Sequence, residues 1–260
     1  MNTNKHRRFA LVREIPETFN QCIKPLENPQ AIDVELARTQ HRRYCEALSQ
    51  LGFELIVLPA DDRYPDCAFV EDTAVVIEDR AIITRPGVES RRGEVDAVCE
   101  ALSPYKRIDR ILPPGSLEGG DVLPAEDLVF VGLTERTNQE GIHQLERLLR
   151  GSQLRVVSVP IGRSLHLKTA CNYLGKGLMV VKFFDFDPEV FTDFEIVRPD
   201  PSEVSRLSFL PVNGSVLLPD DCPKAREEFA NSGWKTIPLG LSEIRKAQAG
   251  LTCMSILFQV

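Results

Sequence analysis

Short apolar runs recur along the chain in a repeating order: two runs close together, a charged segment, and then another run. The runs are RFALV, FELIVLP, TAVVIED, AIITRPG, DLVFVGL, LRVVSVP, GLMVVKF, SVLLPD, WKTIPL and MSILFQV. Each is only a few residues long and most are rich in β-branched or aromatic side chains, which is typical of β-strands. The order returns loosely about every 45 to 60 residues, without a letter-by-letter repeat. The chain is therefore predicted to contain several similar strand-rich units.

Charged, helix-prone segments separate several of these runs. They span residues 32–52, 90–105, 138–152 and 221–234. Strands that lie close together fit hairpins, whereas strands joined through a helix fit crossover connections. No linker or low-complexity stretch interrupts the 260 residues. We expect one mixed α/β domain over residues 1–260.

The spacing permits a pseudo-symmetric array of blades that closes around an axis and leaves a central funnel. Periodicity alone does not prove this arrangement. The alternative is a doubly wound sheet, which predicts a glycine-rich phosphate loop after the first strand. The segment RFALVREIPETF, which holds the first run, contains no glycine.

Charge and cysteine usage exclude several classes of protein. A net charge of −7 argues against nucleic acid as a partner, because phosphate-backbone binding normally needs a basic face. Charged residues interrupt every apolar run before it could cross a bilayer, and the first residues lack a signal peptide's apolar region. The seven cysteines form no C-x-x-C pair and no zinc spacing. We expect a cytoplasmic protein with reduced thiols, no bound metal and no membrane contact.

One of the four histidines stands out. His6 lies in a basic N-terminal arm, and His41 and His143 lie in charged helical segments where solvated faces are expected. His166 alternates with leucines on what resembles a strand edge, which favours a partly buried imidazole. A lone histidine is weak evidence, and a structural role for it is about as common as a catalytic one, but a nearby base can activate a cysteine thiolate wherever the two meet in space.

Cys253 lies close to the last apolar run, in AQAGLTCMSILFQV. Free cysteine is usually a small buried hydrophobe. The small, turn-like AQAG before it offers another interpretation, because a turn ahead of a strand can present a thiol at a pocket.

Acidic residues gather in two short segments. PDCAFVEDTAVV contains Asp66, Glu71 and Asp72, and SLEGGDVL places Glu118 before two glycines. In a strand, Glu71 and Asp72 would point to opposite faces, so that one could enter a pocket. The glycines permit a close backbone approach beside Glu118, although such pairs also occur in plain turns.

Taken together, these segments resemble the dimethylarginine dimethylaminohydrolase family. The matching segments are RYPDCAFVEDTAVV, ITRPGVESRRGEV, LEGGDVL, VGLTERTNQEG, SLHLKTACNYLG and GLTCMSILF, in the family's order, and ALVREIPETF resembles its substrate lid. The resemblance implies the pentein fold, a five-bladed pseudo-symmetric α/β propeller with a central active-site funnel. It also implies a catalytic set in which Cys253 is the nucleophile, His166 the acid and base, and Glu118 the carboxylate that orients the imidazole.

The resemblance further implies residues that hold the substrate. Asp66, Glu71 and Asp72 match pocket acids, with Asp72 as the direct partner of the guanidinium. Arg91 and Arg136 match arginines that hold the α-carboxylate, and Ile15 and the backbone of Ala247 match contacts to the α-amino end. One departure is KAQAGLTC, where the family commonly has an Asp-Gly pair and this chain has Gln248 and Ala249.

The activity implied is hydrolysis of an N-omega-methylated arginine to citrulline and methylamine or dimethylamine, through a covalent thiouronium on the cysteine and without a cofactor. Two alternatives stay open: arginine deimination or amidino transfer by the same chemistry, and a non-catalytic guanidino-ligand binder. The partner implied is a small guanidino molecule, and a homodimer stays open.

Overall fold

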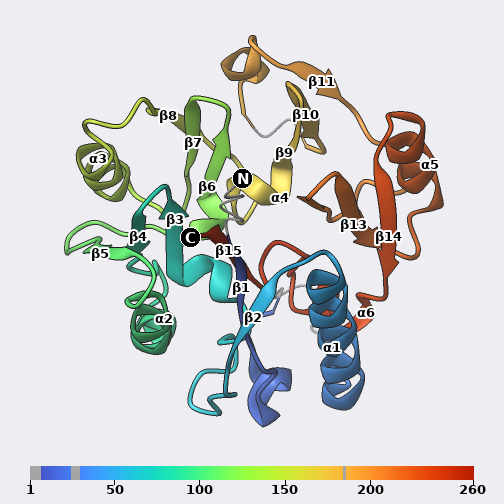
Figure 1. Cartoon of the computed structure of the whole chain (residues 1–260), viewed down its shortest axis with the longest axis horizontal. Helices are drawn as coiled ribbons and strands as arrows, with labels where there is room; N and C mark the ends of the chain where they lie inside the picture. The colour runs from blue at the N-terminus through green and yellow to red at the C-terminus, as the bar shows by residue number, and fades with distance from the viewer. Residues whose placement is uncertain (1–6, 25–29, 184–185) are drawn as a thin grey trace, which may run out of the picture.

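The computed structural model describes residues 7–24, 30–183 and 186–260; His6 lies outside them. These residues form five three-stranded sheets arranged around a common centre (Figure 1). The sheets are β15 (Ile256–Gln259), β1 (Arg8–Arg13) and β2 (Glu54–Leu58); β3 (Ala74–Ile77), β4 (Arg80–Ile83) and β5 (Arg107–Arg110); β6 (Val122–Ala125), β7 (Leu128–Leu133) and β8 (Arg155–Pro160); β9 (Cys171–Gly175), β10 (Leu178–Val181) and β11 (Glu195–Val197); and β12 (Leu210–Val212), β13 (Ser215–Pro219) and β14 (Lys235–Leu239). The five-bladed α/β propeller expected from the sequence is confirmed.

Every blade has the same pairing. The central strand pairs antiparallel with one neighbour and parallel with the other. A tight turn can join only antiparallel strands. A parallel neighbour needs a long crossover, because the chain must return to the end of the sheet where the first strand began. In four blades this crossover contains a helix: α1 (Val34–Gln50), α2 (Val95–Leu102), α3 (Gln139–Leu148) and α5 (Pro223–Asn231). All four lie within the segments that the sequence predicts to be helical, and Figure 1 shows them on the outside of the ring.

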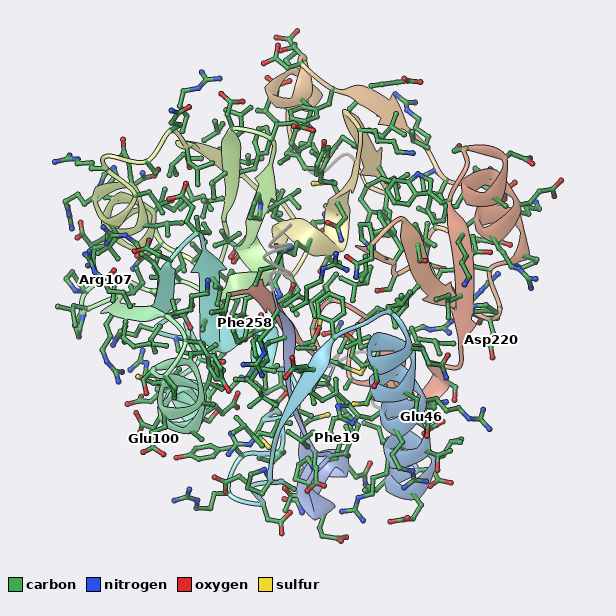
Figure 2. The ribbon with its side chains drawn as sticks, viewed as in Figure 1. Phe19, Glu46, Glu100, Arg107, Asp220 and Phe258 are labelled. Atoms are coloured by element: carbon green, nitrogen blue, oxygen red, sulfur yellow. The ribbon has the colours of Figure 1, made fainter. Side chains whose placement is uncertain are left out.

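The hydrophobic core is divided among the joints between blades. Phe9 and Leu11 of β1 pack in one cluster with residues of the second blade, whereas Ala10 and Val12 pack in another cluster with residues of the fifth. Side chains alternate between the faces of a strand, so one strand serves two joints. Figure 2 shows Glu100 and Arg107 at the rim, whereas Phe258 lies near the centre of the ring. Because the apolar groups are used between blades, polar residues can line the middle.

Short helical turns carry the polar residues of the centre. They are η2 (Val70–Thr73), η3 (Glu89–Glu94), η4 (Gly119–Asp121) and α4 (Leu167–Ala170); the other short helices are η1 (Glu17–Gln21), η5 (Pro188–Phe191) and α6 (Ser242–Lys246). Glu71 and Asp72 therefore lie on a 3₁₀ turn and not on a strand as expected. His166 likewise caps α4 instead of lying on a strand edge.

One further expectation is wrong. His41 on α1 is 5% exposed, not solvated, and burial lowers its pKa to about 4. His143 is exposed, as expected. Across the described ranges, no helix is long and apolar enough to cross a membrane.

Candidate active site

Cys253 lies in a turn between α6 and β15. Its Sγ accepts a hydrogen bond from the backbone N–H of Gly250 at 3.4 Å, and its carbonyl accepts one from Glu71 at 3.1 Å. A Cβ on Gly250 would come within 2.1 Å of Ser208 Oγ, so the turn needs glycine there. Gln248 adopts a positive φ of 56°, a strained conformation for a residue with a side chain. The turn is thus shaped to hold the thiol away from the strand that follows.

Gly119 and Gly120 allow three segments to meet at the centre. A Cβ on Gly119 would lie 1.9 Å from the Glu71 carbonyl oxygen, and one on Gly120 would lie 2.6 Å from His166 Nδ1 and 2.9 Å from Asp72 Oδ1. Real Cβ atoms do not tolerate such distances. The close backbone approach predicted from the glycine pair is present.

His166 and Glu118 form a buried pair. Glu118 Oε2 lies 2.7 Å from His166 Nε2, and the other carboxylate oxygen accepts from the Gly87 N–H at 3.0 Å. Burial lowers the pKa of His166, but the negative charges of Asp72, Glu118 and Asp121 outweigh it and raise the pKa to about 9. The imidazole is therefore a cation at neutral pH and can act as an acid.

The three predicted acids occupy different positions. Asp72 Oδ2 accepts from Arg91 at 2.7 Å and Oδ1 from the Gly120 N–H at 3.2 Å. Burial opposes the charge of Asp72, but His166 and Arg91 outweigh burial and lower its pKa. Asp66 accepts from the Ile23 N–H at 3.2 Å, and burial raises its pKa.

Glu71 has partners on both sides. One carboxylate oxygen lies 2.7 Å from Lys168 Nζ and the other accepts from the Thr252 hydroxyl at 3.0 Å. Because Thr252 precedes Cys253, Glu71 contacts both the ammonium of Lys168 and the turn that carries the thiol.

The two predicted arginines differ in how much of their guanidinium is engaged. Arg91 is 4% exposed and donates from Nε and Nη2 to Glu94, from Nη1 to Asp72 and from Nη2 to the Phe69 carbonyl. Five N–H donors are available on a guanidinium, so one on Nη1 remains for a ligand. Arg136 has Nη1 3.5 Å from Glu118 Oε1.

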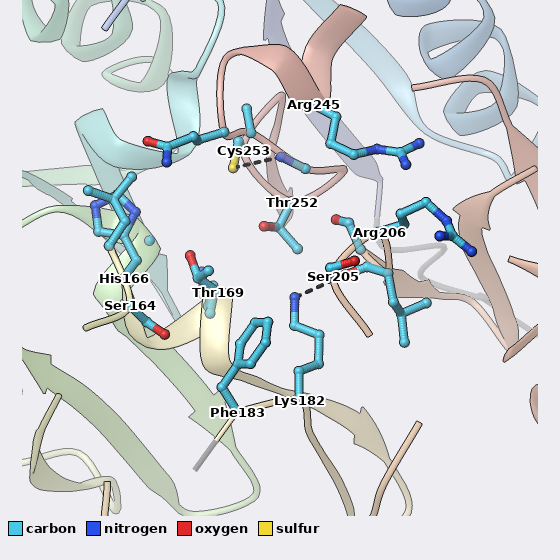
Figure 3. Close-up of a pocket in the computed structure, with 18 of the residues that line it drawn as sticks. Ser164, His166, Thr169, Lys182, Phe183, Ser205, Arg206, Arg245, Thr252 and Cys253 are labelled. Atoms are coloured by element: carbon cyan, nitrogen blue, oxygen red, sulfur yellow. Dashed lines mark hydrogen bonds between the residues drawn. The ribbon is translucent and has the colours of Figure 1, made fainter. Parts of the chain in front are cut away.

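Two cavities share Cys253 in their lining, and Figure 3 shows the larger one. A small one of about 40 Å³ is lined by predicted residues, among them Asp66, Asp72, Arg91, Arg136, His166, Ala247 and Cys253. A larger one of about 370 Å³ shares His166 and Cys253 and contains Glu71 and Lys168. Segments from four blades thus bring most of the predicted residues to one place. Glu118 does not line either cavity but contacts the imidazole of His166 from behind, and Ile15 lies elsewhere.

Ile15 is the predicted residue that the structure places elsewhere. It is 2% exposed and packs in the core joint of the first and fifth blades. It is not among the described residues that line the small cavity, where Ile23 lies instead. Ile23 is 38% exposed. This exposure could not be inferred from the sequence, so no local signal pointed to Ile23.

Other lining residues were missed by sequence reasoning. Gln248 and Ala249 line both cavities, and Lys182 and Thr169 line the larger one. Gln248 was noted only as a departure from a motif. Lys182 carried no local signal, because a lysine after a strand is common at the surface.

The free thiol is held in its neutral form. Burial raises the pKa of Cys253, the charges of Glu71 and Asp72 raise it further, and the result is about 12. A cation bound beside the sulfur would oppose those charges and favour the thiolate.

Asp72, Glu118 and His166 could in principle surround a metal ion, since their ligand atoms lie within 4.8 Å of one another. Each carboxylate already has cationic or N–H partners, namely Arg91 and Gly120 for Asp72 and His166, Gly87 and Arg136 for Glu118. A divalent cation would have to compete with two guanidiniums. The donor set fits an ion-pair network better than a metal centre.

Comparison with known proteins places the chain in a family. The model described as N,N dimethylarginine dimethylhydrolase, eukaryotic, matches residues 8–184. An N(G),N(G)-dimethylarginine dimethylaminohydrolase from Pseudomonas aeruginosa is 37% identical, covering 87% of this chain and 90% of the relative. Another of the same name from Streptomyces coelicolor is 37% identical, covering 95% of each chain.

Solved structures agree. A Pseudomonas aeruginosa protein of this kind, a variant complexed with citrulline, superposes with a TM-score of 0.91 at 33% identity, covering 96% of this chain and 98% of that one. The N-terminal domain of the arginine dihydrolase ArgZ superposes with a TM-score of 0.85 at 16% identity, covering 96% of this chain and 97% of that one, which indicates a shared fold. The fold, the family model and the two relatives together show that this chain belongs to the dimethylarginine dimethylaminohydrolase family.

Proposed function

We propose that this protein hydrolyses N-omega-methylated arginine to citrulline and methylamine or dimethylamine. The observation that carries the proposal is that Cys253 and His166 line the same two cavities, with Asp72 on the wall of the smaller one. A guanidinium is a planar cation with fixed N–H donors, for which a carboxylate is a natural partner. The relatives named for this activity support the same substrate class.

The substrate's amino-acid end is assigned to the small cavity. There the remaining Nη1 donor of Arg91 and the guanidinium of Arg136 would hold the α-carboxylate, and Asp66 and the Ala247 backbone would face the α-ammonium. Glu94 keeps Arg91 in place through a bidentate contact. These contacts would direct the substrate guanidinium toward Asp72 and Cys253.

Binding of the cation would prepare the thiol. Its charge offsets those of Glu71 and Asp72, which lowers the pKa of Cys253 and yields the thiolate. The sulfur adds to the guanidinium carbon, and the imidazolium of His166 gives its proton to the nitrogen that leaves. A thiouronium on Cys253 remains.

Neutral His166 then accepts a proton from water, which attacks the thiouronium carbon. The carbon–sulfur bond breaks and citrulline leaves. Glu118 stabilises the imidazolium and holds the ring through both steps, and general acid–base assistance of this kind is typically worth ~10²–10⁴ in rate. All of these steps use side chains of this chain and need no added cofactor.

The test is turnover with matched substrates. Citrulline formation is measured from asymmetric dimethylarginine, monomethylarginine and arginine, and we expect the methylated compounds to give the higher kcat/KM. A clear preference for arginine would indicate a deiminase. Cys253→Ser should lose turnover while keeping its affinity for dimethylarginine, and mass spectrometry of wild-type protein quenched during turnover should find the adduct on Cys253. Binding without turnover in the wild-type protein would indicate a guanidino-ligand binder.

The same proposal covers the chain as a whole. We assign residues 1–260 to one catalytic domain, supported by the pairing of β1 with β15, which closes the ring. A cytoplasmic location and the lack of a nucleic-acid partner rest on the net charge of −7 and the cysteine pattern. Size-exclusion chromatography with light scattering would distinguish a homodimer from a monomer.

A further inference from the structure

The larger cavity has more volume than the two methyl groups of a dimethylarginine would fill. It measures about 370 Å³, whereas one water needs only ~10–15 Å³ of such space. It adjoins the small cavity along His166, Leu165, Gln248, Ala249 and Cys253, which line both. A substrate whose amino-acid end fills the small cavity therefore has its reacting nitrogens at the entrance to the larger one.

The lining of the larger cavity is rich in cations. Besides His166, five lysine and arginine residues and one carboxylate contribute to it, namely Arg163, Lys168, Lys182, Arg206, Arg245 and Glu71. Lys168 is paired with Glu71. Arg206 and Arg245 share a single carboxylate, that of Asp221, and in Figure 3 their guanidiniums extend away from His166. The positive charges outnumber the negative ones even when Asp221 is included.

Lys182 is one of the cations that line this cavity. Its Nζ donates to the Leu207 carbonyl at 3.0 Å, and within the described ranges no carboxylate lies at ion-pair distance from it. Figure 3 shows its ammonium among Thr169, Ser205 and Thr252. An ammonium has three N–H donors, and a buried charge is costly unless it is paired. Burial lowers the pKa of Lys182 to about 8, so it is mostly charged at neutral pH.

A departing dimethylamine does not complement this lining. Once protonated it is itself a cation, and it offers no acceptor to Lys182 or to the nearby hydroxyls. A carboxylate would supply both the missing charge and the missing acceptors.

We infer that the larger cavity is a subsite for an anionic group on the substrate's omega nitrogen, so that the enzyme also hydrolyses N-omega-(carboxyalkyl)arginines. The inference rests on the proposed function, because it uses the same thiol chemistry and the same orientation of the substrate. Lys182 would bind the carboxylate, with the hydroxyls of Thr169 and Ser205 beside it.

The reaction balances without any other reactant. The Cys253 thiolate bonds to the guanidinium carbon, the bond from that carbon to the substituted nitrogen breaks, and His166 supplies the proton to that nitrogen. The leaving group is then the amino group of an amino acid, which is glycine for a carboxymethyl substituent. Water attacks the remaining thiouronium, the carbon–sulfur bond breaks, and citrulline forms.

The experiment compares two isosteric compounds, N-omega-carboxymethyl-L-arginine and its neutral amide, N-omega-carbamoylmethyl-L-arginine. Citrulline is measured for both, with glycine or glycinamide as the second product. We expect the wild-type protein to prefer the acid in kcat/KM by roughly ten-fold or more, the size of a charge-assisted contact. Lys182→Met should remove most of that preference and Lys182→Arg should retain it. Arg155→Gln changes an exposed arginine at the start of β8 that pairs with Asp127, and it should leave the preference as in the wild type.

Equal or better turnover of the amide by the wild-type protein would overturn the inference, and so would a preference that survives in Lys182→Met. Dimethylarginine is measured in parallel to separate this result from the proposed function. Hydrolysis of dimethylarginine without a preference for the acid refutes the subsite alone, whereas hydrolysis of the acid without that of dimethylarginine refutes the proposed substrate alone. If neither is hydrolysed, calorimetry with Cys253→Ser decides, and equal affinity for acid and amide rejects the subsite.

Discussion

The Nε2 atom of His166 lies 2.7 Å from Oε2 of Glu118, in a contact that solvent does not reach on the Glu118 side. The charge of Asp72, this pairing and the charge of Asp121 together raise the pKa of an imidazole that burial alone would lower. Glu118 thus helps to set the protonation state of His166, even though it is not among the residues that line either cavity.

Glu118→Gln should move the alkaline limb of the pH–rate profile to lower pH. The imidazolium persists in the wild type up to a pKa of about 9, and the first step needs that proton. Removing the carboxylate charge lowers the pKa, so activity is lost earlier as the pH rises. We also expect kcat/KM at pH 7.5 to fall by ~10²–10⁴. Glu54→Gln, on an exposed pair with Arg7, is the control, and an unshifted limb in Glu118→Gln would contradict the assignment.

Arg91→Ala should destabilise the fold as well as weaken substrate binding. The change leaves Asp72 and Glu94 buried without their cation, and breaking a buried pair typically costs about 3–5 kcal/mol. Arg7→Ala removes an exposed pair with Glu54 and should cost far less, because water and salt screen exposed ion pairs. Urea unfolding of both variants measures the difference. Similar losses in the two would show that Arg91 is not held as the structure has it.

Gly120→Ala should reduce turnover strongly while Gly240→Ala has little effect. The new Cβ at position 120 would lie 2.6 Å from His166 Nδ1, whereas at position 240 the nearest atom is 3.5 Å away. His166 or Asp72 must then move, and misplacing a catalytic group by about 1 Å can cost ~10² in rate. Steady-state kinetics, with circular dichroism to compare folding, tests this. Normal kcat in Gly120→Ala would mean that the backbone approach is not required.

Local patterns were sufficient to predict the strands and the outer helices, whereas their closure into five blades was implied by the resemblance to a family. Each strand of RFALV or DLVFVGL buries both faces between two joints, so it leaves a continuous apolar run that can be recognised in isolation. The charged segments between the runs form the outer helices. Each of these helices buries only one face against its blade, so its other face stays charged and the pattern can be recognised in the sequence.

The centre was harder to predict because it depends on contacts between blades. Glu71 and Asp72 resemble part of a strand, but they turn because the chain must pass Gly119 at a distance that no side chain allows. His166 ends its extended stretch at α4, where Asp121 Oδ1 accepts from the Leu167 N–H. Neither partner is near in sequence, so no short-range pattern could reveal these turns.

His41 shows that a charged helical segment does not predict which of its polar residues are buried. Its neighbours on α1 are charged, which predicts a solvated face, yet the ring lies on the side that faces the protein. Burial lowers the pKa of His41 to about 4, so the ring is neutral at pH 7 despite its charged neighbours in the sequence. The resemblance to a family implied a set of site residues that includes Ile15, which lies in the core, and it gave no sign that Lys182 lines the larger cavity beside Cys253.

The reactivity of Cys253 tests the electrostatic account of the site directly. Its pKa is about 12 because burial is reinforced by the charges of Glu71 and Asp72. Glu71→Gln removes one of those charges and leaves Lys168 without its partner, and both changes favour the thiolate. We therefore expect iodoacetamide to modify Cys253 faster in Glu71→Gln than in the wild type at pH 8.5, with ten-fold more thiolate for each unit by which the pKa falls.

Peptide mass spectrometry follows each thiol separately in that experiment. Cys45 is the internal control, because burial and Glu46 raise its pKa and Glu71 does not contribute. Its rate should be the same in both proteins. A Cys253 rate that is unchanged or slower in Glu71→Gln would mean that the acids do not hold the thiol neutral, and the substrate's positive charge would then no longer explain how the thiolate forms. A faster rate would support a site in which the bound substrate generates the thiolate. The positive charge of the substrate offsets the nearby carboxylates while it is bound, whereas Glu71→Gln removes one carboxylate charge permanently.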